Sequence, residues 1–206
     1  PRVGMTGEEF LAAEFSHGDP IIRGIARGEK GLFMGVTNAG KSSFVRNLIV
    51  SCALGRPFLP IYDGGDPLKV ALLDFETRGA RLRRDLQRML EKFSRAECSL
   101  FWKQIVIFPA MEISINRRPL CLSDENHASQ VMVEISNFGA DLIIVDTITR
   151  GFRIRSENDN SEIIDKVMVP LDQLATGTNA ALLSVHHIGK AKSEDGTTRH
   201  AVHRGR

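Results

Sequence analysis

One short segment of the chain restricts both its fold and its chemistry. Residues 35–42 read Gly-Val-Thr-Asn-Ala-Gly-Lys-Ser, which matches the GxxxxGK(S/T) pattern of a phosphate-binding loop. The apolar run at 31–35 predicts a buried strand before the loop, and apolar residues at helical spacing in 41–54 predict a helix after it. A strand, a loop and a helix in this order are the context in which the pattern binds nucleotides.

The loop pattern has a direct physical meaning. Its glycines let successive backbone N–H groups point at phosphate oxygens, and the following helix adds its unpaired N–H groups and the positive end of its dipole. We expect Lys41 to reach the β- and γ-phosphates of ATP and the Ser42 hydroxyl to ligate Mg²⁺. The predicted nucleotide-binding residues are Gly35, Thr37, Asn38, Ala39, Gly40, Lys41, Ser42 and Ser43.

The rest of the chain alternates apolar runs with helical patterns. Apolar runs occur at 70–75, 104–108, 142–146 and 180–185, and helical spacing occurs at 79–93, 125–138 and 163–175, where Pro170 predicts a kink or break. Strands that are apolar throughout are buried on both faces, so we predict an α/β fold with a mostly parallel sheet between helices. A length of 206 residues fits one such domain, expected at 21–206 after an N-terminal helical and loop segment at 1–20.

Acidic side chains end two of these runs, at the carboxyl ends where parallel sheets carry their chemistry. Asp146 ends an apolar strand, a Walker B pattern, and is predicted to hold Mg²⁺ through water together with Ser42. A helix cap is the structural alternative for Asp146. Glu76 lies further toward the strand end than Asp74, so we predict that Glu76 orients and deprotonates the attacking water. Asp74 either orients the site or caps it.

Two histidines, His186 and His187, follow the run at 180–185. A neutral imidazole at this edge can contact the γ-phosphate or the attacking water and report the nucleotide state. Adjacent side chains of a strand point to opposite faces, and we predict His186 as the sensor, with a hydrogen-bonded structural histidine as the alternative. The predicted catalytic residues are therefore Glu76, Lys41 and His186.

Composition restricts the cellular context more than the chemistry. The net charge is only +2, so a basic surface for nucleic acid has to be local. Cys52, Cys98 and Cys121 match no metal or redox pattern and predict reduced thiols in a cytoplasmic protein. The apolar runs are too short to predict a membrane-spanning helix.

The order of these motifs resembles that of one family. The segments that carry the resemblance are 35–42, Asp74-Phe75-Glu76, Leu142-Ile143-Ile144-Val145-Asp146-Thr147, Val185-His186-His187, and Gly55-Arg56-Pro57-Phe58-Leu59 after the first helix. Over residues 20–190 the chain resembles the RecA-like ATPases of the RepA type, hexameric replicative helicases of plasmids and phages. The resemblance implies a RecA-like fold, ATP and Mg²⁺ as ligands, single-stranded DNA as a partner and a ring of six copies. It also implies the roles given above for Lys41, Ser42, Glu76, Asp146 and His186.

The family also places an arginine finger of a neighbouring subunit at the phosphates. Arg204-Gly205 resembles the start of the family's Arg-Gly-Ser-Ser stretch, but Arg206 departs from it and the sequence stops there. We therefore expect the final strands of the core to be missing from this sequence. The finger is expected at Arg204 or beyond residue 206.

RecA-like motors hold nucleic acid on loops after the Walker B strand and after the sensor strand. The corresponding loops here are 147–161 and 189–206, and their candidate cations are Arg150, Arg153, Arg155, Lys190 and Lys192. Cations on loops suit contacts with a phosphate backbone, and Phe152 is the aromatic residue of these loops that could stack on a base. The alternative is a pair of solvated charged loops.

Three other interpretations are possible from sequence alone. Residues 37–43 also resemble the loop of ribosome-assembly GTPases, but the Asn-Lys-x-Asp guanine reader of those proteins is missing downstream. A recombinase or a signalling ATPase of the KaiC kind shares the motif order. A nucleotide-binding scaffold without catalysis is the third alternative.

The arginine-rich helix predicted at 79–93 fits a solvated face or a subunit contact.

Overall fold

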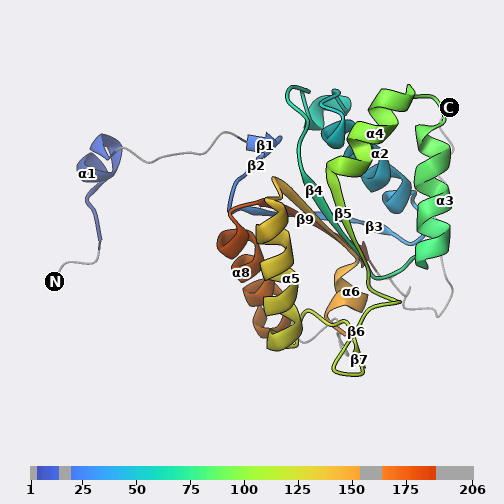
Figure 1. Ribbon diagram of the computed structural model, residues 1–206. Coiled ribbons are helices and arrows are strands. Elements are labelled where there is room, and N and C mark those ends of the chain that lie inside the picture. Colours follow the sequence, from blue (N-terminus) through green and yellow to red (C-terminus); the bar gives the residue numbers. More distant parts are fainter. Residues whose placement is uncertain (1–3, 14–19, 154–163, 189–206) are drawn as a thin grey trace, which may run out of the picture.

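The structure, a computed structural model, describes residues 4–13, 20–153 and 164–188. Its centre is a sheet of five parallel strands in the order β3, β9, β8, β4, β5 (Figure 1). The bounds are β3 (Lys30–Val36), β4 (Val70–Asp74), β5 (Ile105–Pro109), β8 (Leu142–Asp146) and β9 (Ala181–Ile188). This sheet confirms the predicted α/β class.

Helices cover both faces of the sheet (Figure 1). One layer consists of α2 (Lys41–Ala53), α3 (Gly79–Leu90) and α4 (Arg95–Lys103). The other consists of α5 (Glu125–Phe138), α6 (Ile148–Gly151) and α8 (Val169–Thr178), which follows the short η2 (Ile164–Met168). Each layer packs its own apolar core against the strands, so the sheet is enclosed from two sides.

The central strand β8 illustrates why these strands are apolar throughout. Ile144 packs into the core under α2, α3 and α4, and Ile143 packs into the core under α5 and α8. Both side chains are completely buried, because β8 has a paired strand on each side and a helical layer on each face. Burial of this apolar surface stabilises the centre of the sheet and fixes the positions of its strand ends.

Short elements complete the described chain. They are α1 (Gly7–Ala12), the hairpin of β1 (Pro20–Ile22) and β2 (Ile25–Ala26), η1 (Leu59–Ile61), and the hairpin of β6 (Ser114–Ile115) and β7 (Arg118–Pro119). Helix α1 begins with a capping box between Thr6 and Glu9, buries none of its residues and lies apart from the sheet in Figure 1. None of the described helices is long and apolar enough to cross a membrane.

The first predicted strand is not buried as expected. β3 is an edge strand, paired only with β9 in the main sheet, and Leu32, Met34 and Val36 on one of its faces are 48–53% exposed. A short apolar run looks the same in the sequence whether its strand is central or at an edge, so composition alone could not separate the two. The loop that follows β3 therefore starts from the open edge of the sheet.

Two boundaries also differ from those predicted, and the break predicted at Pro170 is confirmed. The predicted helix 79–93 ends at Leu90, and a separate helix, α4, begins after a capping box in which Ser94 and Glu97 bond to each other's backbone N–H groups. Pro170 lies in the first turn of α8, where a missing N–H group costs nothing, so the break falls just before it. Strand β9 continues through both histidines, which places them inside the paired strand.

Candidate nucleotide-binding site

The loop between β3 and α2 has the backbone shape that its sequence predicts. Gly40 has a φ of +80° and Asn38 a φ of +66°, left-handed values that glycine and asparagine adopt most readily. Gly40 accepts the first helical hydrogen bond, from Phe44 N–H, and supplies no side chain to cap the helix. The leading N–H groups of α2 are therefore free of a side-chain cap and can meet an anion.

Lys41 is buried at the start of α2. Its Nζ donates hydrogen bonds to the carbonyl oxygens of Gly35 at 2.6 Å and Val36 at 2.7 Å. The ammonium group is therefore held over the loop by two main-chain acceptors rather than by a carboxylate. Such neutral partners can be exchanged for phosphate oxygens, which form stronger charge-assisted bonds.

Asp146 lies at the end of β8, buried next to the loop. Burial, together with the nearby charges of Asp74 and Glu76, raises the pKa of this carboxyl from 3.8 to about 6, while a hydrogen bond from Ser42 and the charge of Arg46 act against the rise. Among the described residues Oδ1 of Asp146 has no hydrogen-bond partner. An unsatisfied carboxylate oxygen beside a serine hydroxyl fits Mg²⁺, which prefers hard oxygen ligands and takes few of them from the protein.

Asp74, opposite Asp146 in the β4–β8 register, shapes the turn that follows β4. Its Oδ1 accepts hydrogen bonds from the backbone N–H groups of Glu76 at 2.9 Å and Thr77 at 2.6 Å. Burial raises the pKa of Asp74, and these two backbone bonds and the Arg46 charge act against the rise. Of the two predicted roles, the capping one is realised: Asp74 fixes the backbone that presents Glu76.

Glu76 collects three polar partners on a single oxygen. Thr147 Oγ1 donates to Oε1 at 3.2 Å, His187 Nε2 lies 3.0 Å from it, and Arg150 Nε lies 3.7 Å from it. The carboxylate is partly exposed and faces the same cavity as Lys41. These contacts fix the orientation of the residue predicted to act as the base.

The two histidines take different partners. His187 contacts Glu76, whereas His186 Nδ1 lies 3.4 Å from Thr149 Oγ1. The β3–β9 register places His187 opposite Gly35, and His187 lines the cavity at the phosphate loop. The structure thus brings His187 to the predicted base, rather than His186, which was predicted as the sensor.

One cavity of about 620 Å³ joins the phosphate loop to Glu76 and His187, a volume in the range of roughly 300–1,000 Å³ found for ligand sites. Its lining residues are Thr37, Asn38, Gly40, Lys41, Ser42, Ser43, Glu76, Thr149, Arg150 and His187. Gly35 and Ala39, the other two predicted loop residues, take part through the backbone: Gly35 accepts from Lys41, and Ala39 N–H donates to Val36. The predicted loop residues therefore form one wall, and residues of the turn after β4, of α6 and of the end of β9 form the other.

The residues predicted to contact nucleic acid lie in different environments in the structure. Arg150 lines the phosphate cavity, and Arg153 donates a hydrogen bond to the carbonyl oxygen of Pro119. Phe152, considered for base stacking, is buried in the core under α5 and α8 and cannot stack on a base. The other positions named for nucleic acid or for the finger, Arg155, Lys190, Lys192 and Arg204, lie outside the described residues.

Arg46 is a structural contributor that no sequence motif predicted. Its guanidinium donates to Asp85 at 2.8 Å and to Thr77 Oγ1 at 2.8 Å, and it lies 3.8 Å from Asp74. It therefore ties the helix after the phosphate loop to the turn that carries Glu76. Only its position one turn after Ser42 could have indicated this role.

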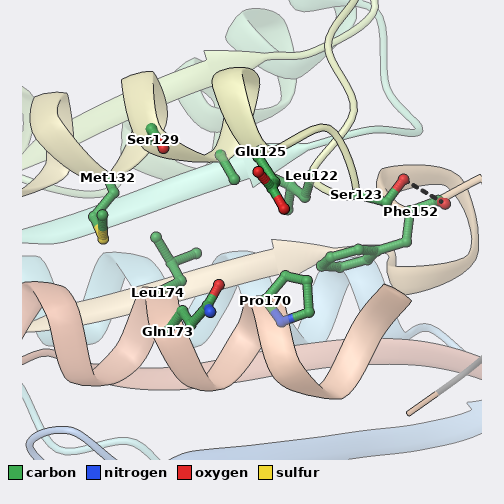
Figure 2. A pocket seen from close by; sticks show the side chains of 10 residues that line it. Leu122, Ser123, Glu125, Ser129, Met132, Phe152, Pro170, Gln173 and Leu174 are labelled. Atoms are coloured by element: carbon green, nitrogen blue, oxygen red, sulfur yellow. Dashed lines mark hydrogen bonds between the residues drawn. The ribbon is translucent and has the colours of Figure 1, made fainter. Parts of the chain in front are cut away.

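A second cavity, of about 330 Å³, lies between α5 and α8 (Figure 2). Leu122, Met132, Phe152 and Leu174 supply much of its apolar lining, and Ser123 donates a hydrogen bond to the Phe152 carbonyl. It shares no lining residue with the first cavity, and its one charged lining residue is Glu125. A cavity that carries a carboxylate and no cation does not suit the phosphates of a nucleotide.

Comparisons with known proteins agree with this geometry. A KaiC-like protein of the hyperthermophilic archaeon Pyrococcus horikoshii is similar in structure, with a TM-score of 0.56 and 18% identity over 86% of this chain and 71% of that one. The RadB recombinase is similar with a TM-score of 0.52 and 18% identity over 83% of this chain and 67% of that one. These likenesses confirm the predicted RecA-like P-loop fold. Among curated proteins, none matches this sequence.

The family of the chain is identified by a match of its sequence to a family model. Residues 4–193 match the AAA domain, a span that includes the phosphate loop, Glu76, Asp146 and both histidines. Because this match covers most of the 206 residues, the chain belongs to the AAA domain family of P-loop ATPases.

Proposed function

We propose that this chain binds ATP with Mg²⁺ and hydrolyses it to ADP and phosphate. The observation that carries the proposal is the convergence of Lys41, Ser42 and Glu76 on one cavity, with the buried Asp146 hydrogen-bonded to Ser42. Phosphoryl transfer to water needs groups that bind the phosphates, a site for a divalent cation and a carboxylate that orients the attacking water.

The loop between β3 and α2 supplies the groups that bind the triphosphate. The backbone N–H groups at the start of α2 and the Lys41 ammonium supply positive potential, and the cavity opens directly over them. Ser42 and Asp146 are the residues that would hold Mg²⁺, directly or through water, and the bound ion would neutralise charge on the phosphate oxygens. ATP is then positioned with its terminal phosphate toward Glu76.

Hydrolysis is assigned to Glu76. Its carboxylate accepts a proton from a water molecule as the water oxygen bonds to the γ-phosphorus and the bond from that phosphorus to the β–γ bridging oxygen breaks. The products are ADP and inorganic phosphate, and the proton taken up by Glu76 is then released to solvent. His187, in contact with the same carboxylate, takes the sensor role predicted for His186.

As a finer assignment we propose that ATP turnover drives a RepA-type DNA helicase that acts in replication as a homohexameric ring in the cytoplasm. The order of the phosphate loop, Glu76, Asp146 and the paired histidines supports this role. The alternative, which the fold supports equally, is a RecA- or KaiC-like recombinase or signalling ATPase.

Replacing Glu76 by Gln tests the catalytic assignment. Glutamine keeps the shape of the side chain but cannot accept the proton of water, so turnover should fall by about 10²–10⁴-fold while ATP still binds. Phosphate release and equilibrium binding of ATP measure the two effects. The matched control is Glu134→Gln on the exposed face of α5, which should behave like the wild type. Unchanged turnover in Glu76→Gln would exclude Glu76 as the base.

Replacing Asp146 by Asn should separate stability from function. The folded-state pKa of about 6 lies above the ordinary 3.8, so the folded protein binds more protons than the unfolded chain between these values, and stability falls as pH rises through them. Removing the charge should therefore raise the free energy of unfolding at pH 8, by up to about 3 kcal/mol, with little effect below pH ~4. Mg²⁺-dependent turnover should be lost.

Urea unfolding at pH 8 and pH 4 in the absence of Mg²⁺ measures the stability difference. Asp165→Asn, at an exposed position of η2, is the control and should change neither stability nor turnover. A destabilised Asp146→Asn protein at pH 8, or one with full Mg²⁺-dependent activity, would contradict the role given to this carboxylate.

The helicase assignment is tested by the response to single-stranded DNA. A helicase should hydrolyse ATP faster when DNA is present, bind DNA less tightly as salt increases, and separate a forked duplex. The full-length protein is assayed for all three, with Glu76→Gln as the control that binds ATP without turnover. DNA-independent hydrolysis without strand separation would instead support the signalling ATPase.

A further inference from the structure

We propose that Arg150 is a catalytic residue of this chain that binds the γ-phosphate of ATP, supplying in cis a positive charge at the transferred group. This inference rests on the proposed ATPase function and adds a residue to that site. It replaces the interpretation of Arg150 as a contact to nucleic acid, which came from its place in a loop after β8.

The position of Arg150 is fixed by the packing around α6. Ile148 and Phe152, on either side of it in sequence, are both buried in the core under α5 and α8. The backbone is held as well, since Gly151 N–H donates to the Thr147 carbonyl at 2.9 Å and the Gly151 carbonyl accepts from Leu122 N–H at 2.8 Å. A four-residue helix anchored in this way presents the one long polar side chain between its anchors to the cavity.

A close contact between α6 and the end of β4 sets the distance from Arg150 to Glu76. A Cβ atom at Gly151 would lie 3.0 Å from the ring of Phe75, tighter than an ordinary contact, so any larger residue would require the ring to shift by a few tenths of an ångström. Phe75 directly precedes Glu76, and Gly151 directly follows Arg150. The contact therefore places the arginine beside the carboxylate of the predicted base, where Nε lies 3.7 Å from Oε1.

The ion pair with Glu76 is one that a phosphate can replace. The side chain of Arg150 is 59% exposed, and ion pairs of this length near solvent contribute little to stability. A guanidinium offers five donors in a planar fork that matches phosphate oxygens, often in pairs of parallel bonds. A triphosphate in the cavity is therefore a stronger partner for Arg150 than the single oxygen of Glu76.

The geometry also selects which phosphate Arg150 reaches. Lys41 and Ser42 lie at the loop end of the cavity, and Glu76 and His187 lie at the strand-end wall where water must attack. A cation in contact with Glu76 is on the side of the terminal phosphate, which ADP lacks. As Arg150 turns to this phosphate, Oε1 of Glu76 loses one of its three partners and becomes available to the attacking water.

The experiment compares wild type, Arg150→Ala and Arg150→Lys in equilibrium binding of ADP and of a non-hydrolysable ATP analogue with Mg²⁺, and in ATP turnover. Loss of a charge-assisted contact predicts at least about tenfold weaker binding of the triphosphate analogue by Arg150→Ala, with unchanged affinity for ADP. Turnover should fall by about 10³-fold or more, with partial recovery in Arg150→Lys. The control is Arg84→Ala, an exposed arginine of α3, which should match the wild type.

The outcomes separate this inference from the proposed function. Equal losses for ADP and the triphosphate would overturn the γ-phosphate contact, and so would wild-type binding and turnover in Arg150→Ala. A variant with normal nucleotide behaviour but weaker binding of single-stranded DNA would restore the nucleic-acid interpretation. If the folded wild-type protein binds neither nucleotide, the proposed function fails and this inference fails with it.

Discussion

Hydrogen-bond register between parallel strands decides which side chains of this protein can act together. The register sets Asp74 opposite Asp146, and Asp146 opposite Val185, while Gly35 pairs with His187. Residues separated by more than a hundred positions in the sequence thereby share one edge of the sheet. Because Ile143 and Ile144 lock the centre of this sheet from both sides, the strand ends keep their relative positions without help from a ligand.

The same arrangement concentrates charge in a way that favours ligand binding over stability. Asp74, Glu76 and Asp146 lie close enough that burial and mutual repulsion raise the pKa of Asp146 well above its ordinary value. Arg46 and two backbone N–H groups offset part of this for Asp74, but Oδ1 of Asp146 keeps no partner among the described residues. A divalent cation would remove the remaining imbalance, which is the behaviour expected of a functional site.

The sequence predicted the parts of the site that follow from a fixed local pattern. The phosphate loop, the β8 end at Asp146 and the turn at Glu76 each depend on a short motif in a strand context, and the structure brings all of them together. The sequence could not decide between His186 and His187. Side chains alternate along a strand, so the two histidines face opposite sides of the sheet, but this alternation does not show which side holds the cavity. Arg150 was predicted to contact nucleic acid because it lies in the loop after β8. The direction of its side chain depends instead on how Gly151 packs against Phe75.

Two features of the fold were missed. Helix α4 follows α3 after a short turn, and its start is marked only by the capping box of Ser94 and Glu97, so the predicted helix ended at residue 93 and α4 itself was not predicted. The exposure of Met34 in β3 depends on where the strand lies in the sheet order, which no local pattern records. The exposure of β3 is thus set by tertiary packing, whereas the start of α4 carries a local signal, the Ser-x-x-Glu capping box, that the prediction did not use.

Main-chain amides and Lys41 are proposed to bind the phosphates of ATP, and equilibrium binding of ATP with Mg²⁺ measures that contact. The folded wild-type protein should bind, and Lys41→Ala should bind about 10- to 100-fold more weakly, because it loses charge-assisted bonds to the phosphates. Lys103→Ala, at the exposed end of α4, should bind like the wild type. No binding by the folded wild type, or equal affinity in Lys41→Ala, would exclude this loop as the phosphate site.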